Sequence, residues 1–346
     1  MSLLANLEVL VAIWSYMRGS EMLDIKVGYR CNNRCLHCVI EPVRQKIVNN
    51  NEKPDLTTEE IISIIEDATS NGINTVVLTG GEITTREDFE KIVTYAVNKG
   101  LKVNIQTNGR ALWRERSCEF MANLPGLLFI VAIHAPHAEI HDAITQVKGS
   151  FYETIDAIKN LRNINKEIAA KIVISKLNYQ YLYETALFAK GLGVNEFCVV
   201  FPHALDFPQE LFKSVVPRYY SIKDEVHRIA NFSEKECFWI SFETIPYCIC
   251  TDSEAFWRRN CDLLSKAIEN KDSRPNTLAS EKNLFNWEEI RPKMKEKGIN
   301  CSKCVFNLLC EGPWREYIQN FGFTEFSPIK QDQVFGLLED YGENNI

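Results

Sequence analysis

The sequence predicts an α/β protein built on a parallel sheet, and three observations support this prediction. Strand-like and helix-like segments alternate along residues 21–205, with six strands in all. The segments 76–78, 128–133 and 172–174 consist mainly of Val, Leu and Ile, as expected for strands buried on both faces of a parallel sheet. Glycines follow most of the helical segments, where a left-handed residue commonly ends a helix. In such an alternating α/β fold, the helical connections between parallel strands are expected to be right-handed.

The first strand, residues 22–29, has apolar side chains at every second position, the period of a β-strand. A polar loop is expected over 44–55. The helix that follows, 56–72, begins with Thr57 and Glu60 at the spacing of a capping box. The other strands are expected at 74–82, 101–110, 127–135, 169–175 and 195–203, and the other helices at 88–100, 112–123, 150–163, 179–193 and 219–231.

Unusual residues follow four consecutive strands. A cysteine-rich segment comes after the first strand, and Gly80-Gly81-Glu82 after the second. Gln106, Thr107 and Asn108 follow the third strand, and His134 follows the fourth. In α/β folds the chemistry takes place at the carboxyl ends of the strands. These residues are therefore expected to surround one site.

Three cysteines, Cys31, Cys35 and Cys38, lie within eight residues. Structural zinc sites are the alternative interpretation, but they usually pair two C-x₂-C knuckles to supply four ligands. His37 is directly next to Cys38 and cannot easily point at the same metal atom. Three thiolates suit a four-iron cubane in which each cysteine holds one iron. The fourth iron would then keep an open position, as a reactive site requires.

The C-x₃-C-x₂-C segment, followed by Gly80-Gly81-Glu82 after the next strand, resembles the radical S-adenosylmethionine (radical SAM) superfamily over residues 21–205. The resemblance implies a partial (βα)6 barrel, similar to a TIM barrel. It also implies that SAM chelates the open iron of a [4Fe-4S] cluster and is cleaved to a 5′-deoxyadenosyl radical. The family usually has an aromatic residue where this chain has His37, a position at which a ring still packs.

The resemblance also implies roles for the strand-end residues. Gly80 and Gly81 would let the backbone approach SAM closely, and Glu82 with nearby carbonyls would receive the methionine ammonium group. Contacts to ribose or carboxylate are expected from Gln106, Thr107 and Asn108, with His134 at the next strand end. The alternative for these polar residues is turn chemistry, above all at Asn108-Gly109.

A second cysteine group, Cys301, Cys304 and Cys310, reads C-x₂-C-x₅-C. Beside a radical SAM core it resembles the SPASM and twitch extensions, which hold auxiliary [4Fe-4S] clusters. Trp314 stands where a full SPASM pattern has another cysteine, so one auxiliary cluster is expected. Cys248 is the preferred fourth ligand, and Cys250 and Cys261 are its rivals. Zinc is the alternative metal, since thiolates satisfy it equally well.

The expected organisation is an N-terminal amphipathic helix over 1–20, a radical SAM barrel over 21–205 and a small cysteine-rich extension over 206–346. The apolar start lacks the basic residues of a signal peptide and is short for a membrane span. A cytoplasmic protein is therefore expected, in which twelve cysteines favour metal ligands over disulfides. The net charge of −7 disfavours nucleic acid as a partner.

Three functions remain open from the sequence. The first is a radical SAM enzyme that modifies a peptide or protein side chain, with a flavodoxin- or ferredoxin-type reductant. The second acts on a small molecule, as in cofactor biosynthesis or dehydrogenation. The third is a non-enzymatic zinc-binding protein. No catalytic residue is assigned, although Cys198 could point into the barrel and return a hydrogen atom. A mononuclear metal site of His134, His137 and His141 is a minor alternative.

Overall fold

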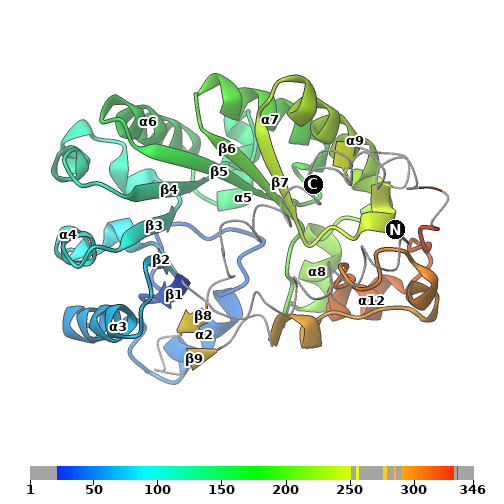
Figure 1. Ribbon diagram of the computed structural model, residues 1–346, viewed down its shortest axis with the longest axis horizontal. Coiled ribbons are helices and arrows are strands. Elements are labelled where there is room, and N and C mark those ends of the chain that lie inside the picture. Colours follow the sequence, from blue (N-terminus) through cyan, green and yellow to red (C-terminus); the bar gives the residue numbers. More distant parts are fainter. Residues whose placement is uncertain are drawn as a thin grey trace, which may run out of the picture.

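The computed structural model of the protein describes residues 22–250, 255–256, 276–278, 284–285, 290–330 and 333 (Figure 1). The predicted amphipathic helix over 1–20 lies outside the described residues, as does Cys261, one of the rival ligands. Among the helices of the described part of the chain, none has the length and apolar character needed to cross a membrane.

The described strands form one nine-stranded sheet with a regular order. Strands β1 to β7 pair in parallel in chain order, which confirms the α/β prediction. On the other side of β1, β8 pairs in parallel and β9 follows it antiparallel. The strands are β1 (Met22–Lys26), β2 (Thr75–Thr79), β3 (Lys102–Thr107), β4 (Leu127–Ala132), β5 (Glu167–Val173), β6 (Glu196–Val200), β7 (Trp239–Glu243), β8 (Asn276–Leu278) and β9 (Leu284–Phe285).

The helices of the repeat cover the outer side of a curved sheet (Figure 1). Their apolar stripes pack on the outward side chains of the strands, and these contacts form one continuous core. The predicted capping box of α3 is present, with Thr57 accepting from the backbone N–H of Glu60. The described helices are α2 (Glu41–Asn49), α3 (Thr58–Ser70), α4 (Phe89–Asn98), α5 (Ala138–Thr145), α6 (Ser150–Asn163), α7 (Leu182–Gly191), α8 (Gln209–Val215), α9 (Tyr219–Lys235) and α12 (Arg315–Phe321).

Two local predictions are wrong. The segment expected as a loop over 44–55 begins inside α2, where a proline in the first turn and the burial of Ile47 favour a helix. The helix expected over 112–123 is a series of short 3₁₀ turns. There the Asn160 amide donates to the carbonyls of Leu112 (3.0 Å) and Trp113 (2.7 Å), so these carbonyls are bonded to a side chain.

The inner face of the sheet differs from its outer face. In β1, β3 and β6 buried positions alternate with partly exposed ones, and the partly exposed side chains are often polar. Lys171 of β5, Cys198 of β6 and Glu243 of β7 share this inner face. The Lys171 ammonium lies 3.2 Å from the Glu243 carboxylate, and the Cys198 thiol donates to the same carboxylate over 3.2 Å. The inner face therefore offers charged groups to a ligand.

The C-terminal segment packs on the same core. Tyr317 of α12 accepts a hydrogen bond from the backbone N–H of Tyr219 (3.0 Å), and Phe201 stacks on Tyr219 with ring centroids 3.8 Å apart. The backbone bridge between Lys295 and Trp314 holds the cysteine-rich segment 301–310 beside α12. The second cysteine group is thereby fixed to the barrel.

Candidate active site and metal centres

The loop that leaves β1 carries Cys31, Cys35 and Cys38, and all three thiols are free and half-buried. Backbone hydrogen bonds fasten the loop to the end of α5, from Arg34 to the Thr145 carbonyl and from Leu36 to the Ile144 carbonyl, each 3.0 Å. The three cysteines therefore face one site at the carboxyl end of the first strand, where the sequence predicted them.

Burial governs the chemistry of these thiols. It raises the pKa of Cys31 to about 11, and it raises that of Cys35 to about 12 together with the neighbouring sulfurs of Cys38 and Cys31. The backbone N–H of Asn33 donates to the Cys31 sulfur over 3.4 Å. Thiols held close together in such surroundings become thiolates only when a cation compensates them. The loop has the chemistry of a metal centre.

Gly80 and Gly81 lie against the backbone of the cysteine loop. A Cβ atom on Gly80 would be 2.3 Å from the Gly28 carbonyl oxygen, and one on Gly81 would be 1.9 Å from that of Arg30. Gly80 also has φ of +123°, a conformation that side chains rarely allow. The structure thus gives these glycines a role in packing the ends of β1 and β2 together, and their contact with SAM stays a prediction.

Glu82 is buried, and four donors satisfy its carboxylate. One oxygen accepts from the Thr84 backbone N–H (3.1 Å), the Thr84 hydroxyl and the Thr107 hydroxyl (both 2.6 Å). The other accepts from the backbone N–H of Asn108 (2.6 Å). Burial raises the pKa of Glu82. The carboxylate joins the ends of β2 and β3, while its expected contact with the methionine ammonium stays a prediction.

The third strand end is tied to the cysteine loop. The Asn108 amide donates to Asn32 over 2.7 Å and approaches the Cys31 sulfur at 3.8 Å, while Gln106 accepts from Thr79 over 3.1 Å. Arg110, which the sequence analysis did not assign, donates to the Asn32 carbonyl over 2.6 Å and to the Asn33 side chain over 2.9 Å. Arg110 directly follows Asn108-Gly109 at the end of the third strand, and this position in the sequence could have identified it as a site residue.

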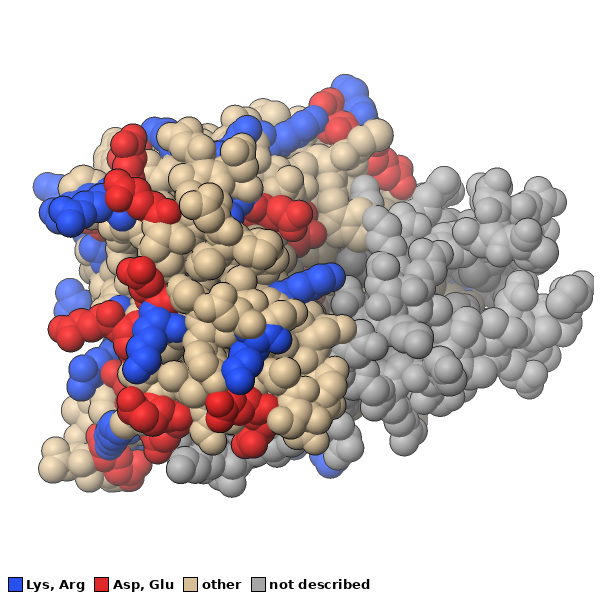
Figure 2. Space-filling model, turned by 60° about the vertical axis from the view of Figure 1, so that its left-hand side comes forward, with Lys and Arg blue, Asp and Glu red and all other residues tan. Residues whose placement is uncertain are grey.

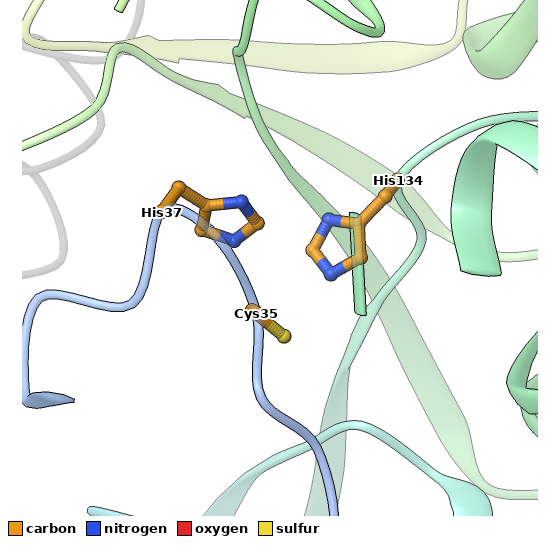
Figure 3. Close-up of side chains that lie close together, drawn as sticks. All are labelled: Cys35, His37 and His134. Carbon is orange, nitrogen blue, oxygen red and sulfur yellow. The ribbon is translucent and has the colours of Figure 1, made fainter. Parts of the chain in front are cut away.

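His134 follows β4, as predicted, and its ring is buried. Its neighbours are His37, with ring centroids 4.7 Å apart, and His141, with centroids 5.2 Å apart. His137 points elsewhere, toward Glu184 and the Tyr181 ring. The structure therefore separates His137 from the other two histidines of that minor alternative. Ring nitrogens of His37 and His134 and the Cys35 sulfur lie instead within 4.8 Å of one another (Figure 3).

The second cysteine group gathers four sulfurs. Burial, and then the sulfurs of Cys310, Cys304 and Cys301, raise the pKa of Cys248 to about 12. Backbone N–H groups donate to two of these sulfurs over 3.4 Å, Gly312 to Cys310 and Ile329 to Cys304. This arrangement supports Cys248 as the fourth ligand, which nevertheless stays a prediction.

The rival Cys250 is fully buried, and its thiol is directed to the Lys223 carbonyl of α9 at 3.8 Å. At the position of the missing SPASM cysteine, the buried Trp314 ring stacks on His203 with centroids 3.9 Å apart. Lys295 covers the Trp314 ring with its ammonium 3.5 Å from the centroid. The tryptophan thus fills its site with packing contacts.

The spacing of the sulfurs bears on the choice between zinc and iron. Within the described residues, neither cysteine group brings three sulfurs within 4.8 Å of one another. Tetrahedral ligation at a Zn–S distance of about 2.3 Å would place the sulfurs about 3.8 Å apart. Wider spacing suits cysteines that each hold a different iron of one cluster. Three thiolates on the first loop suit a cubane that keeps one iron open, and the metal of the second group stays a prediction.

Comparison with known proteins agrees with this geometry. Residues 25–189 match the sequence profile of the radical SAM superfamily. They form a radical SAM domain. The superfamily uses a [4Fe-4S] cluster and SAM, and the domain contains both the cysteine loop and the strand ends described above. Sequence and structure thus agree on the class of cofactor.

Two curated relatives cover the same part of the chain. The AdoMet-dependent heme synthase of Methanosarcina barkeri is 31% identical over 171 residues, or 49% of this chain and 47% of that protein. The antilisterial bacteriocin subtilosin biosynthesis protein AlbA of Bacillus subtilis is 26% identical over 173 residues, or 50% of this chain and 37% of that protein. The chain therefore spans about half or less of the length of these curated relatives.

A solved structure is similar over almost the whole chain. Native anSMEcpe with bound AdoMet and Kp18Cys peptide superposes with a TM-score of 0.66 and 14% identity, covering 93% of this chain and 99% of that one. At this identity the likeness shows the fold. It confirms the predicted α/β fold of a partial (βα)6 barrel.

Proposed function

We propose that the protein cleaves S-adenosylmethionine reductively and uses the resulting 5′-deoxyadenosyl radical to abstract a hydrogen atom from a peptide or protein side chain. One observation carries the proposal. The half-buried thiols of Cys31, Cys35 and Cys38 share one loop at the carboxyl end of β1, and that loop is hydrogen-bonded to Gly81 and Glu82. Three ligands for a four-iron cluster leave one iron for the cosubstrate.

When bound, the cluster supplies the electron that splits SAM. The chain's own residues hold the loop in place, because the backbone N–H groups of Gly81 and Glu82 donate to the carbonyls of Gly28 (2.8 Å) and Arg30 (2.7 Å). Arg110 fixes the segment between Cys31 and Cys35 from the β3 side. The protein thus orients the cofactors, and the cofactors carry out the bond cleavage.

Gly80, Gly81, Glu82, Gln106, Thr107, Asn108 and His134 remain the proposed SAM-contacting set. Asn108 is hydrogen-bonded to Asn32 and Glu82, whereas His134 Nδ1 has no hydrogen-bond partner among the described residues. Glu82 and Thr107 are bonded to each other, so they would act mainly by holding the strand ends in position. The methionine ammonium would then be received mainly by strand-end carbonyls.

The second part of the proposal is one auxiliary [4Fe-4S] cluster on Cys248, Cys301, Cys304 and Cys310. The sulfurs of the other three cysteines raise the pKa of Cys248, which supports this ligand set. Residues 206–346 form the proposed extension after the core of 21–205, and the first part of the extension adds β7 to the core sheet. The auxiliary site lies on the segment that packs against Tyr219 and Phe201.

The proposed substrate is a peptide or protein side chain. Two similarities support it: AlbA is named for the biosynthesis of a bacteriocin, and anSMEcpe was solved with a peptide. The partly exposed Lys171–Glu243 pair on the inner face would bind a zwitterionic or polar group. The net charge of −7 disfavours nucleic acid as a substrate, and Figure 2 shows basic and acidic residues interspersed over one outer face.

A small-molecule substrate is the second candidate. The relative with 31% identity is a heme synthase, and the charged inner face would also suit the carboxylates of a small acid. Incubation of the enzyme with SAM, dithionite and either a peptide pool or a cofactor precursor separates the two. Lys171→Met should slow turnover of the true substrate and leave 5′-deoxyadenosine formation without substrate unchanged.

The proposed setting is the cytoplasm, with a flavodoxin or ferredoxin as the one-electron donor. Such a cluster is kept reduced only by a low-potential donor, and twelve cysteines suit a reducing compartment. Anaerobic assays that replace dithionite with flavodoxin, its reductase and NADPH test the donor. Failure to form 5′-deoxyadenosine under these conditions, with dithionite active, would exclude that class of partner.

A further inference from the structure

Two buried imidazoles lie beside one cysteine of the cluster loop. His37 belongs to the loop itself, and His134 follows β4 on the opposite side (Figure 3). One ring nitrogen from each histidine and the Cys35 sulfur lie within 4.8 Å of one another. The exposed fraction is 8% for His37 and 3% for His134. The two rings are therefore largely shielded from solvent beside the half-buried Cys35.

Both rings carry a nitrogen without a partner. The Nδ1 atoms of His37 and His134 are buried and have no hydrogen-bond partner within the described residues. A buried polar atom that lacks a partner costs free energy, so a native site normally supplies one. A neutral imidazole has one N–H donor and one acceptor nitrogen. Each neutral ring therefore has one N–H to donate, and the Cys35 sulfur is an acceptor beside the pair.

The rings are held in place by other atoms. The His134 backbone N–H donates to His141 Nδ1 over 3.3 Å, and the Asn178 amide donates to the His134 carbonyl over 2.9 Å. The loop around His37 is fixed by the 3.0 Å bond from Leu36 to the Ile144 carbonyl. These contacts set the ring positions through the backbone, and they leave the Nδ1 atoms of His37 and His134 available.

We propose that the His37–His134 pair donates a hydrogen bond to the Cys35 sulfur, or to the cluster sulfide beside it, and thereby raises the reduction potential of the SAM-binding cluster. This inference rests on the proposed function, because it requires the cluster on Cys31, Cys35 and Cys38. Reduction adds negative charge to the cluster sulfurs, so an N–H donor stabilises the reduced state more than the oxidised one. The histidines would act as positioning residues that ease electron uptake.

An alternative use of the same atoms is a mononuclear metal ion on Cys35, His37 and His134. That ion would take one sulfur away from the cluster, so the two uses exclude each other. The experiment must therefore measure which metal is present as well as the potential. The full chain, reconstituted anaerobically with iron and sulfide, is the appropriate material for both measurements.

The test compares His37→Phe and His134→Phe with the wild type by EPR-monitored redox titration without substrate. Phenylalanine keeps a ring at each position and removes the nitrogens. We expect unchanged iron content and a lower potential, such that the ratio of reduced to oxidised cluster at the wild-type midpoint falls about tenfold, a shift of about 59 mV. His37→Gln, which retains an N–H donor, should recover part of the shift.

His137→Phe is the matched control. His137 lies in the same loop as His134 but is exposed and directed at Glu184. The reduction potential of the cluster in His137→Phe should therefore equal that of the wild type. Intact clusters with unchanged potentials in both Phe variants would overturn this inference and leave the proposed function standing. A wild-type protein without a cluster, carrying a zinc ion that His37→Phe loses, would overturn both.

Discussion

The carboxylate of Glu82, after β2, accepts a hydrogen bond from the backbone N–H of Asn108, after β3, over 2.6 Å. The Thr107 hydroxyl donates to its other oxygen. A buried acid thus joins two neighbouring strand ends directly beneath the cysteine loop. Its raised pKa reflects the cost of burial, which the four donors offset.

Glu82→Gln should destabilise the fold and disturb the site together. An amide places an NH₂ group where the structure has only donors, so at least one buried donor loses its partner. We expect a loss of about 1–3 kcal/mol in the free energy of unfolding, measured by urea unfolding. Glu184→Gln, at an exposed acid that pairs with His137, is the control. Equal stability of both variants would show that the network contributes nothing.

Gly81→Ala should prevent the cysteine loop from docking. The added methyl group would be 1.9 Å from the Arg30 carbonyl oxygen, a contact that forces the loop to move. We expect reduced iron incorporation and a lower melting temperature.

Gly191→Ala is the matched control, since a Cβ atom there meets nothing within 4 Å, and alanine is the better helix former. It should be neutral or slightly stabilising. If Gly81→Ala took up iron like the wild type, the close approach of the two strand ends would be unimportant for the site.

Cys248→Ala should remove the auxiliary cluster. Its sulfur is grouped with those of Cys301, Cys304 and Cys310, so its loss should reduce iron by about four atoms per chain if the cluster is lost entirely. Formation of 5′-deoxyadenosine without substrate should persist. Cys250→Ala, at a buried thiol directed to a helix carbonyl, should keep all the iron. The opposite pattern would assign the fourth ligand to Cys250.

Stability should fall in mild acid because of the buried histidines. Burial lowers the pKa of His141 to about 4, whereas an unfolded histidine titrates near pH 6.5. The unfolded state therefore binds protons first, so the stabilisation is complete above about pH 6.5 and is lost as the pH falls toward 4.

The free energy of unfolding should fall less between pH 7 and pH 4 in His141→Phe than in the wild type. The difference should be about 3 kcal/mol at most. Chemical unfolding of the protein at several pH values measures it. His227→Phe, whose imidazole is only partly buried, serves as the comparison. If the slope for His141→Phe equalled that of the wild type, the proton uptake would belong to other groups.

The sequence predicted the six-strand repeat and the positions of the strand-end residues because burial of both sheet faces leaves a strong apolar pattern. β7 was missed, because Trp239–Glu243 is a short segment beyond the regular repeat, and its pairing with β6 makes it a strand. The packing role of Gly80 and Gly81 was also missed, since sequence does not show which backbone lies opposite.

The pairing of His37 with His134 could not be predicted, because 97 positions separate them and only the fold brings their rings together. The grouping of Cys248 with the distant cysteines was predicted from the resemblance, and the fold supports it. Local patterns thus predicted elements and ligands, while contacts between distant loops required the structure.

The most direct test is an anaerobic assay of the reconstituted protein with SAM and dithionite, comparing the wild type with the Cys31→Ala, Cys35→Ala, Cys38→Ala triple variant. The wild type should form 5′-deoxyadenosine and methionine and show the EPR signal of a reduced cubane. The triple variant should lose that signal and the cleavage while keeping its auxiliary iron. Cleavage of SAM by the triple variant at the wild-type rate would contradict the account.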